Sequence, residues 1–168
     1  MQLRNSTKVA YTAVLATLAL IFSYIESLIP VNAYVPGIKL GLANVVSVVA
    51  IYLLSPVYAY MIVFIRTILS GFLFGNLFSI IYSLMGGILS VIVMSFLKKT
   101  DKFSIIGISV AGGVFHNIGQ LIVAIFAVSQ LKLYYYGPVL IISGIMMGII
   151  VGVLSLIIIK RVETYVRL

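Results

Sequence analysis

Residues 138–159, PVLIISGIMMGIIVGVLSLIII, form an apolar stretch without a charged residue. Such a stretch is long enough to cross a bilayer, because a spanning helix needs about 20 mostly apolar residues. Toward the N-terminus, polar and Pro/Gly positions divide the chain into five further apolar stretches: residues 9–29, 38–54, 57–74, 77–97 and 103–131. The sequence therefore predicts an all-α integral membrane protein in which one domain, residues 1–168, contains six transmembrane helices.

The second of these stretches is short and contains residues that are unusual in a spanning helix. Gly41 and Asn44 lie within residues 38–54, and Pro36-Gly37 immediately precede them. Backbone that departs from a helix is tolerated at membrane depth only where protein or a water-filled cavity surrounds it. We therefore expect this helix to be tilted, or partly unwound at its start.

The sparse charges indicate how the chain is oriented. Only 8% of the residues are charged, against about a quarter in a soluble domain, and this excludes a water-soluble globule. Cytoplasmic segments of membrane proteins collect Lys and Arg. With the N-terminus inside, the inner segments hold Arg4, Lys8, Lys98, Lys99, Lys102, Lys160, Arg161 and Arg167, and the outer segments hold Lys39 and Lys132. The sequence predicts a multi-pass protein in the lipid of a prokaryotic plasma membrane, with both termini cytoplasmic and no nucleic-acid partner.

The scarcity of reactive side chains excludes several classes of catalyst. The chain has no Cys, one His and three acids, Glu26, Asp101 and Glu163. It therefore lacks the residues for disulfides, thiolate nucleophiles, Cys- or multi-His metal sites and Asp-rich Mg²⁺ sites. No G-x-x-x-x-G-K-[ST] phosphate loop occurs, so any ATP would be used by partner ATPases. We expect this chain to have no enzyme activity and no cofactor of its own, and to act by binding or transport.

Polar residues inside the predicted spans are candidates for a binding site. Arg66 lies near the middle of the third span, where a charged side chain costs at least a few kcal/mol. In the fifth span, His116 and Gln120 are four residues apart with Asn117 beside them, which predicts one polar face. Asn44 adds a polar group to the second span. The alternative is that these groups only hold helices together through hydrogen bonds or buried pairs.

The connection between the first two spans also carries candidate residues. Glu26 and Lys39 flank a loop punctuated by Pro30, Pro36 and Gly37, and this loop contains the aromatic Tyr34. It could form a lid over a cavity, with the two charges orienting a ligand. The alternative is an interfacial salt bridge of little energetic weight. Because the cations in and near the spans outnumber the acid, the sequence favours an anionic or partly anionic ligand.

Small residues form smooth stripes on two predicted helices. Gly144, Gly148 and Gly152 repeat every fourth residue in the last span, which indicates tight helix packing. Ala13 and Thr17 do the same in the first span, where they could pack internally or dock another membrane subunit. Two further motifs are interpreted as packing contacts: Ser83-x-x-Gly86-Gly87-x-x-Ser90 and Ser109-x-x-Gly112-Gly113-x-x-His116.

Ordered motifs along nearly the whole chain carry a family resemblance. They are Glu26-x-x-x-Pro30, the run Val35-Pro36-Gly37-Ile38-Lys39-Leu40-Gly41-Leu42-Ala43-Asn44, Arg66 followed by Leu69-Ser70-Gly71, the Ser83 to Ser90 motif, and His116-Asn117-x-Gly119-Gln120. Together they resemble the Gx transporter family, which is also labelled heptaprenyl diphosphate synthase component I. That family is in turn similar to the substrate-binding S components of energy-coupling factor (ECF) transporters.

The resemblance implies a six-helix S-component bundle that captures a small metabolite from outside. Such a bundle would associate with a transmembrane coupling protein and two cytoplasmic ATPases, docking through Ala13 and Thr17, where S components typically have Ala-x-x-x-Ala. Ligands of S components commonly lie near the outer side, under the loop joining the first two helices. The positions concerned would be Glu26, Tyr34, Lys39 and Asn44, with Arg66 and His116 deeper.

Two other functions stay open at the level of sequence. The synthase label suggests an accessory role in isoprenoid or quinone biosynthesis. It would be non-catalytic, because prenyl elongation needs carboxylates that bind Mg²⁺ and the only Asp is Asp101 in a Lys-rich loop. Family context also suggests an accessory subunit of a flavin- or quinone-linked electron-transfer system, although the chain offers no haem-ligand pair.

Overall fold

The computed structural model describes residues 5–29, 41–129 and 131–166, and this part of the chain is helical throughout, without a strand. The helices are α1 (Asn5–Leu28), α3 (Ala43–Leu53), α4 (Pro56–Phe74), α5 (Leu77–Lys99), α6 (Ile105–Val128), the 3₁₀ helix η1 (Leu131–Tyr136) and α7 (Gly137–Val166). The all-α prediction is confirmed. Five helices are long and apolar enough to cross a membrane, as expected of a multi-pass membrane protein.

Helix α3 differs from the predicted second span. Its 11 residues rise only about 16 Å, roughly half the thickness of the hydrocarbon core of a bilayer. Gly41 has a φ of +71°, a left-handed conformation that stops the helix from extending toward the N-terminus. The sequence predicted a span across residues 38–54 that is tilted or partly unwound at its start, and the described helix covers only residues 43–53 of it. Residues 38–40 lie outside the described part.

The ends of several helices follow from local sequence. Pro56 lies in the first turn of α4, where its missing N–H is not needed. Before α5, Asn76 and Ser79 form a reciprocal capping box, in which the Ser79 N–H donates to Asn76 Oδ1 at 2.8 Å. The Ser104 hydroxyl accepts a hydrogen bond from the Gly107 N–H at the start of α6. These caps fix where the helices turn back across the bundle.

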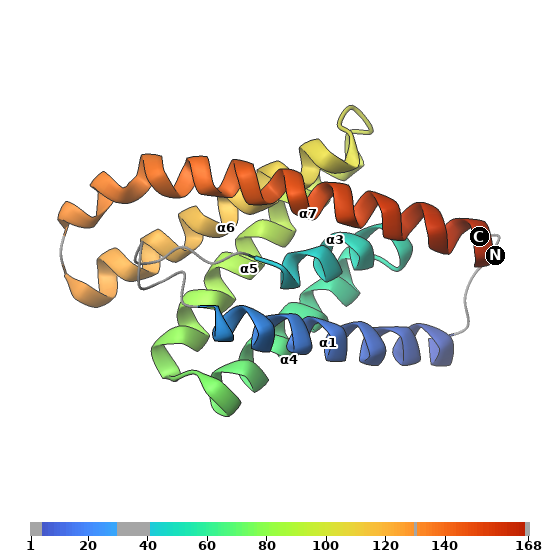
Figure 1. The fold of residues 1–168 in the computed structure, drawn as a ribbon, viewed down its shortest axis with the longest axis horizontal. Coiled ribbons are helices and arrows are strands. Elements are labelled where there is room, and N and C mark those ends of the chain that lie inside the picture. Colours follow the sequence, from blue (N-terminus) through green and yellow to red (C-terminus); the bar gives the residue numbers. More distant parts are fainter. Residues whose placement is uncertain (1–4, 30–40, 130, 167–168) are drawn as a thin grey trace.

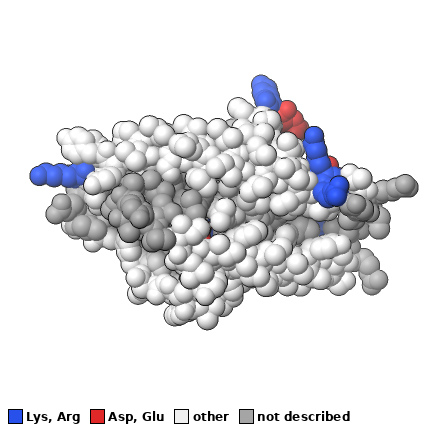
Figure 2. All heavy atoms as spheres, in the orientation of Figure 1, with Lys and Arg blue, Asp and Glu red and all other residues white. Residues whose placement is uncertain are grey.

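The helices form an elongated bundle with α3 inside it (Figure 1). Helix α3 packs against α1, α4 and α7, and the first part of α1 and the last part of α7 lie at the same end of the molecule. Figure 2 shows the charged side chains at the margins of one face, with a broad and almost uncharged surface between them. Such a surface suits lipid. Which end faces the cytoplasm stays a prediction.

Helix α3 is the buried centre of the bundle. Residues 43–51 are all buried, which is the position expected of a helix that is apolar on every side. Two polar side chains from neighbouring helices bind its backbone. The Lys98 ammonium of α5 donates to the Ile51 carbonyl at 2.6 Å and lies 4.6 Å from the centre of the Tyr52 ring. The Ser155 hydroxyl of α7 donates to the Val45 carbonyl at 3.4 Å. Lys98 thus compensates carbonyls at the C-terminus of a buried helix.

Glycines bring α6 and α7 into close backbone contact. A β-carbon added at Gly144, Gly148 or Gly152 would lie 2.9, 2.6 or 2.8 Å from the Cα of Val114, Val110 or Ile106. The predicted packing role of this stripe is confirmed. Helices α5 and α6 also approach closely. A β-carbon added at Gly119 of α6 would lie 3.0 Å from the Cα of Gly86, in the Ser83 to Ser90 motif of α5.

Candidate binding site

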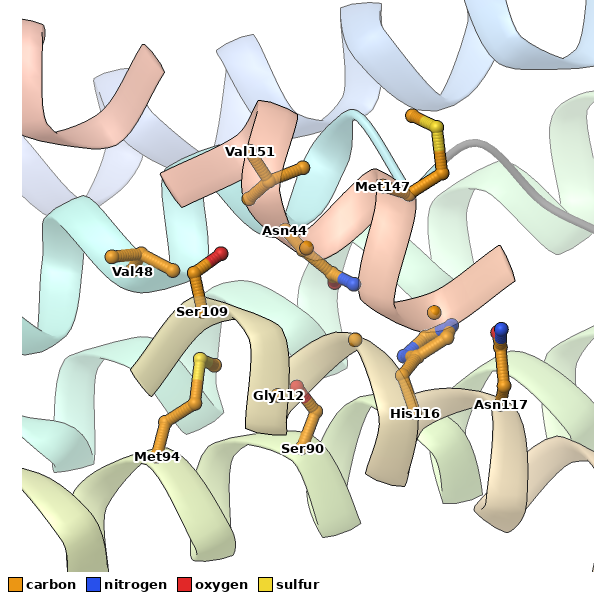
Figure 3. A pocket seen from close by; sticks show the side chains of 14 residues that line it. Asn44, Val48, Ser90, Met94, Ser109, Gly112, His116, Asn117, Met147 and Val151 are labelled. Carbon is orange, nitrogen blue, oxygen red and sulfur yellow. The ribbon is translucent and has the colours of Figure 1, made fainter. Parts of the chain in front are cut away.

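A small polar cavity lies between α3, α5, α6 and α7 (Figure 3). Its volume is about 20 Å³, enough for about one water molecule. The lining combines small, apolar and polar residues: Gly41, Asn44, Val48, Ser90, Met94, Ser109, Gly112, Gly113, His116, Asn117, Gly144, Met147, Gly148 and Val151. In Figure 3 the side chains of Asn44, Ser90 and His116 converge from three different helices. Three residues predicted from the sequence, Asn44, His116 and Asn117, therefore share one cavity.

The predicted single polar face on α6 is divided between two neighbouring helices. A β-carbon added at Gly86 of α5 would lie 2.8 Å from Gln120 Cγ and 3.2 Å from His116 Cε1, so these side chains face α5. Asn117 instead donates from Nδ2 to the Leu140 carbonyl of α7 at 2.7 Å. Asn117 therefore joins α6 to α7, the helix-bridging role considered as the alternative to ligand binding.

Gln120 is completely buried beside this cavity without lining it. Neither its side-chain nitrogen nor its side-chain oxygen has a hydrogen-bond partner among the residues that the structure describes. A buried amide without partners is costly, and in the apolar interior of a membrane bundle no bulk water compensates it. The packing against Gly86 explains its place in the fold but not its polar character.

Arg66 lies on α4 and contacts α1 and α3. Its side chain is 6% exposed. Nη1 donates to the Ser23 hydroxyl of α1 and Nη2 to Asn44 Oδ1, both at 3.4 Å. Arg66 does not line the cavity itself. Asn44 connects the two, because its side chain lines the cavity and accepts from Arg66.

Glu26 lies at the junction between α1 and the start of α3. Its carboxylate accepts the backbone N–H of Gly41 at 2.7 Å, and the side chain is half-buried. Through these contacts Glu26 and Arg66 are both bound to the start of α3, at Gly41 and Asn44 respectively. The other two residues predicted for this region, Tyr34 and Lys39, lie outside the described residues, and so does the predicted lid.

Similarity to known proteins identifies the family. The family described as heptaprenyl diphosphate synthase component I matches residues 15–158. The chain belongs to this family. No curated protein and no solved structure matches the chain. Family membership, predicted from the ordered motifs, is confirmed for component I, and the resemblance to ECF S components stays a prediction.

The three acidic residues lie in separate parts of the fold. Glu26 is near the end of α1, Asp101 lies between α5 and α6, and Glu163 is in the last turns of α7. Within the described ranges, no three His, Cys, Asp or Glu side chains are grouped in a way that could hold a metal ion. Apart from Arg66 and Glu26, the polar side chains that converge in the bundle are amide, hydroxyl and imidazole groups.

Two hydroxyl groups of the cavity were not selected as site residues from the sequence. Ser90 and Ser109 line it, both are almost completely buried, and neither hydroxyl has a hydrogen-bond partner among the described residues. Both occur in motifs of small residues that were interpreted only as packing contacts. The available signal was the spacing of these serines from the glycines of the same motifs. A small residue that lets two helices approach can also place a hydroxyl group between them.

The stripe of small residues on α1, Ala13 and Thr17, faces outward. Ala13 and Thr17 are both exposed, and the Thr17 hydroxyl donates to the Ala13 carbonyl at 3.0 Å. On an adjacent face of the helix, Ala16 and Ala19 are buried. The outward stripe is thus free of internal packing and available to lipid or to another subunit.

Proposed function

We propose that this protein is the substrate-binding subunit of an ECF-type importer. It captures an anionic or partly anionic small metabolite, such as a vitamin or an isoprenoid or quinone precursor, from outside the cell. The observation that carries the proposal is the polar cavity between α3 and α5–α7, adjacent to a buried arginine. Burying polar and ionisable groups inside a membrane bundle costs free energy. Such groups therefore usually mark a path or a binding site for a ligand.

The cavity has the chemistry of a binding site but is closed. It offers amide, hydroxyl and imidazole groups from α3, α5 and α6, which can orient a polar ligand by hydrogen bonds. A volume of about 20 Å³ holds no metabolite, so capture requires the walls to separate. Asn44 of α3 joins this cavity to Arg66, because its side chain lines the cavity and accepts a hydrogen bond from the guanidinium.

Energy for transport would come from partner subunits. The sequence contains no phosphate loop, so hydrolysis of ATP belongs to two cytoplasmic ATPases coupled through a transmembrane protein. The exposed stripe of Ala13 and Thr17 is the proposed docking surface, since small residues let another helix approach closely. This assembly requires a prokaryotic plasma membrane in which both termini of the chain are cytoplasmic.

The importer proposal is tested by purifying the tagged chain from its native membrane. We expect a transmembrane coupling protein and two ATPases to co-purify with it. Ala13→Leu should abolish this association, whereas Ala127→Leu, a matched change of an exposed alanine on α6, should preserve it. A chain that never associates with ATPases, or an Ala13→Leu variant that associates normally, contradicts the proposed assembly.

The family description favours a second candidate, a non-catalytic accessory of isoprenoid or quinone biosynthesis. The dispersed acids argue against catalysis of prenyl transfer by this chain, since that chemistry needs several carboxylates around Mg²⁺. An accessory would change product formation when added to a soluble prenyl synthase, and a pure importer subunit would not. A coloured cofactor that purifies with the chain would instead favour the electron-transfer alternative.

A further inference from the structure

Arg66 is a buried cation whose hydrogen-bonding capacity is poorly used. Its two contacts are to neutral oxygens at 3.4 Å, and its Nε has no partner among the described residues. No carboxylate of the described residues is in ion-pair contact with the guanidinium. A buried charge is tolerated only when it is paired and hydrogen-bonded. Among the described residues, the arginine therefore has no carboxylate as a direct partner.

The Glu26 carboxylate is bound by a backbone amide at the start of α3 and makes no direct contact with the guanidinium. Glu26 binds the Gly41 N–H at 2.7 Å, and it is half-buried near the end of α1, whereas Arg66 is 6% exposed. The half-buried Glu26 carboxylate can change position more readily than the guanidinium, which α1, α3 and α4 enclose.

The position of these groups relative to the cavity indicates which ligand atoms they would meet. Gly41 and Asn44 line the cavity, and the same two residues bind Glu26 and Arg66. The first turn of α3 also begins there, and the N-terminus of a buried helix favours negative charge. A ligand in the cavity would therefore place its anionic group beside Arg66.

We propose that Arg66 anchors a carboxylate or phosphate group of the ligand, and that Glu26 is a resident counter-anion that this group displaces. The inference rests on the proposed function and specifies the ligand chemistry of the same site. If Glu26 stayed in place, an added anion would leave the site with excess negative charge in a medium of low dielectric constant. Exchange of one anion for another keeps the charge of the site balanced. Phosphate would bind through the same guanidinium fork as carboxylate.

The test measures thermal unfolding of the detergent-purified chain in acetate, inorganic phosphate or chloride at equal ionic strength. We expect acetate or phosphate, but not chloride, to raise the unfolding midpoint of the wild type. Glu26→Gln should lower the apparent dissociation constant about tenfold, because one charge-assisted hydrogen bond no longer has to be broken. The anion that gives the larger effect distinguishes a carboxylate from a phosphate ligand.

Matched variants separate this exchange from general effects of charge. Glu163→Gln removes an acid of α7 that lies away from the site and should leave anion binding unchanged. Arg66→Lys keeps the charge without the planar fork and should weaken binding at least severalfold. Unchanged or weaker anion binding in Glu26→Gln overturns the proposed exchange, even when Arg66→Lys fails to fold. Failure to co-purify with ATPases would refute the importer and leave these anion measurements intact.

Discussion

The backbone contact between α6 and α7 makes a quantitative prediction for Gly148→Ala. The new methyl group would lie 2.6 Å from Val110 Cα and 3.1 Å from the Ser109 carbonyl oxygen. Carbon atoms prefer a separation of about 3.5 to 4.0 Å, so the two helices must move apart locally by about 1 Å. Overpacking of this kind costs about 1 to 3 kcal/mol.

Intrinsic helix preference works in the opposite direction, which makes the prediction discriminating. Alanine is favoured over glycine in a helix interior by about 0.5 to 1 kcal/mol. Steric cost should exceed this gain, and the unfolding midpoint should fall on the order of 5 °C for a chain of this size. The assay is thermal unfolding in detergent followed by circular dichroism at 222 nm.

Gly107→Ala is the matched control on α6. Its β-carbon would meet only the Ser104 hydroxyl oxygen at 3.5 Å, an ordinary contact. This variant should therefore be as stable as the wild type or more stable. If Gly148→Ala proves at least as stable as Gly107→Ala, the close backbone contact between α6 and α7 is wrong.

Three further variants test other contacts by the same unfolding assay. Lys98→Met should lower the free energy of unfolding by about 1 to 3 kcal/mol, because the Ile51 carbonyl loses its hydrogen-bond donor. Lys99→Met, a change of the exposed neighbouring lysine, should have little effect. Equal effects of the two changes would refute the capping role of Lys98. Asn117→Leu should destabilise the chain by about 1 kcal/mol through loss of the bond to α7, and an unchanged midpoint would contradict that bond. Gln120→Leu should preserve or raise stability because neither polar atom has a partner among the described residues, and a clear loss would show that a partner exists.

Much of the fold follows from the sequence because apolar length is a strong signal in a membrane protein. The long helices were predicted from apolar runs between polar or Pro/Gly positions, and the glycine stripe of α7 indicated close packing correctly. The short length of α3 was harder to predict. Residues 43–51 are as apolar as a span, but apolarity does not distinguish a helix buried in protein from one in lipid.

The candidate site was only partly predictable, for geometric reasons. Successive residues on a helix point about 100° apart, so Asn117 is directed away from its neighbour His116 and reaches α7. Gln120, four residues after His116, returns to the same side and faces α5 with it. Helix periodicity could have given this division, whereas the pairing of Arg66 with Ser23 and Asn44 depends on contacts between helices distant in sequence.

The central claim is that this bundle binds an anionic small molecule, and mass spectrometry of small molecules co-purifying with the detergent-solubilised chain tests it most directly. Arg66→Lys and Glu163→Gln, purified in parallel, provide the site variant and its control. The account predicts one anionic metabolite that accompanies the wild type and Glu163→Gln and is depleted in Arg66→Lys. Recovery of lipid and detergent alone, or of the same metabolite at equal yield from all three proteins, would contradict it.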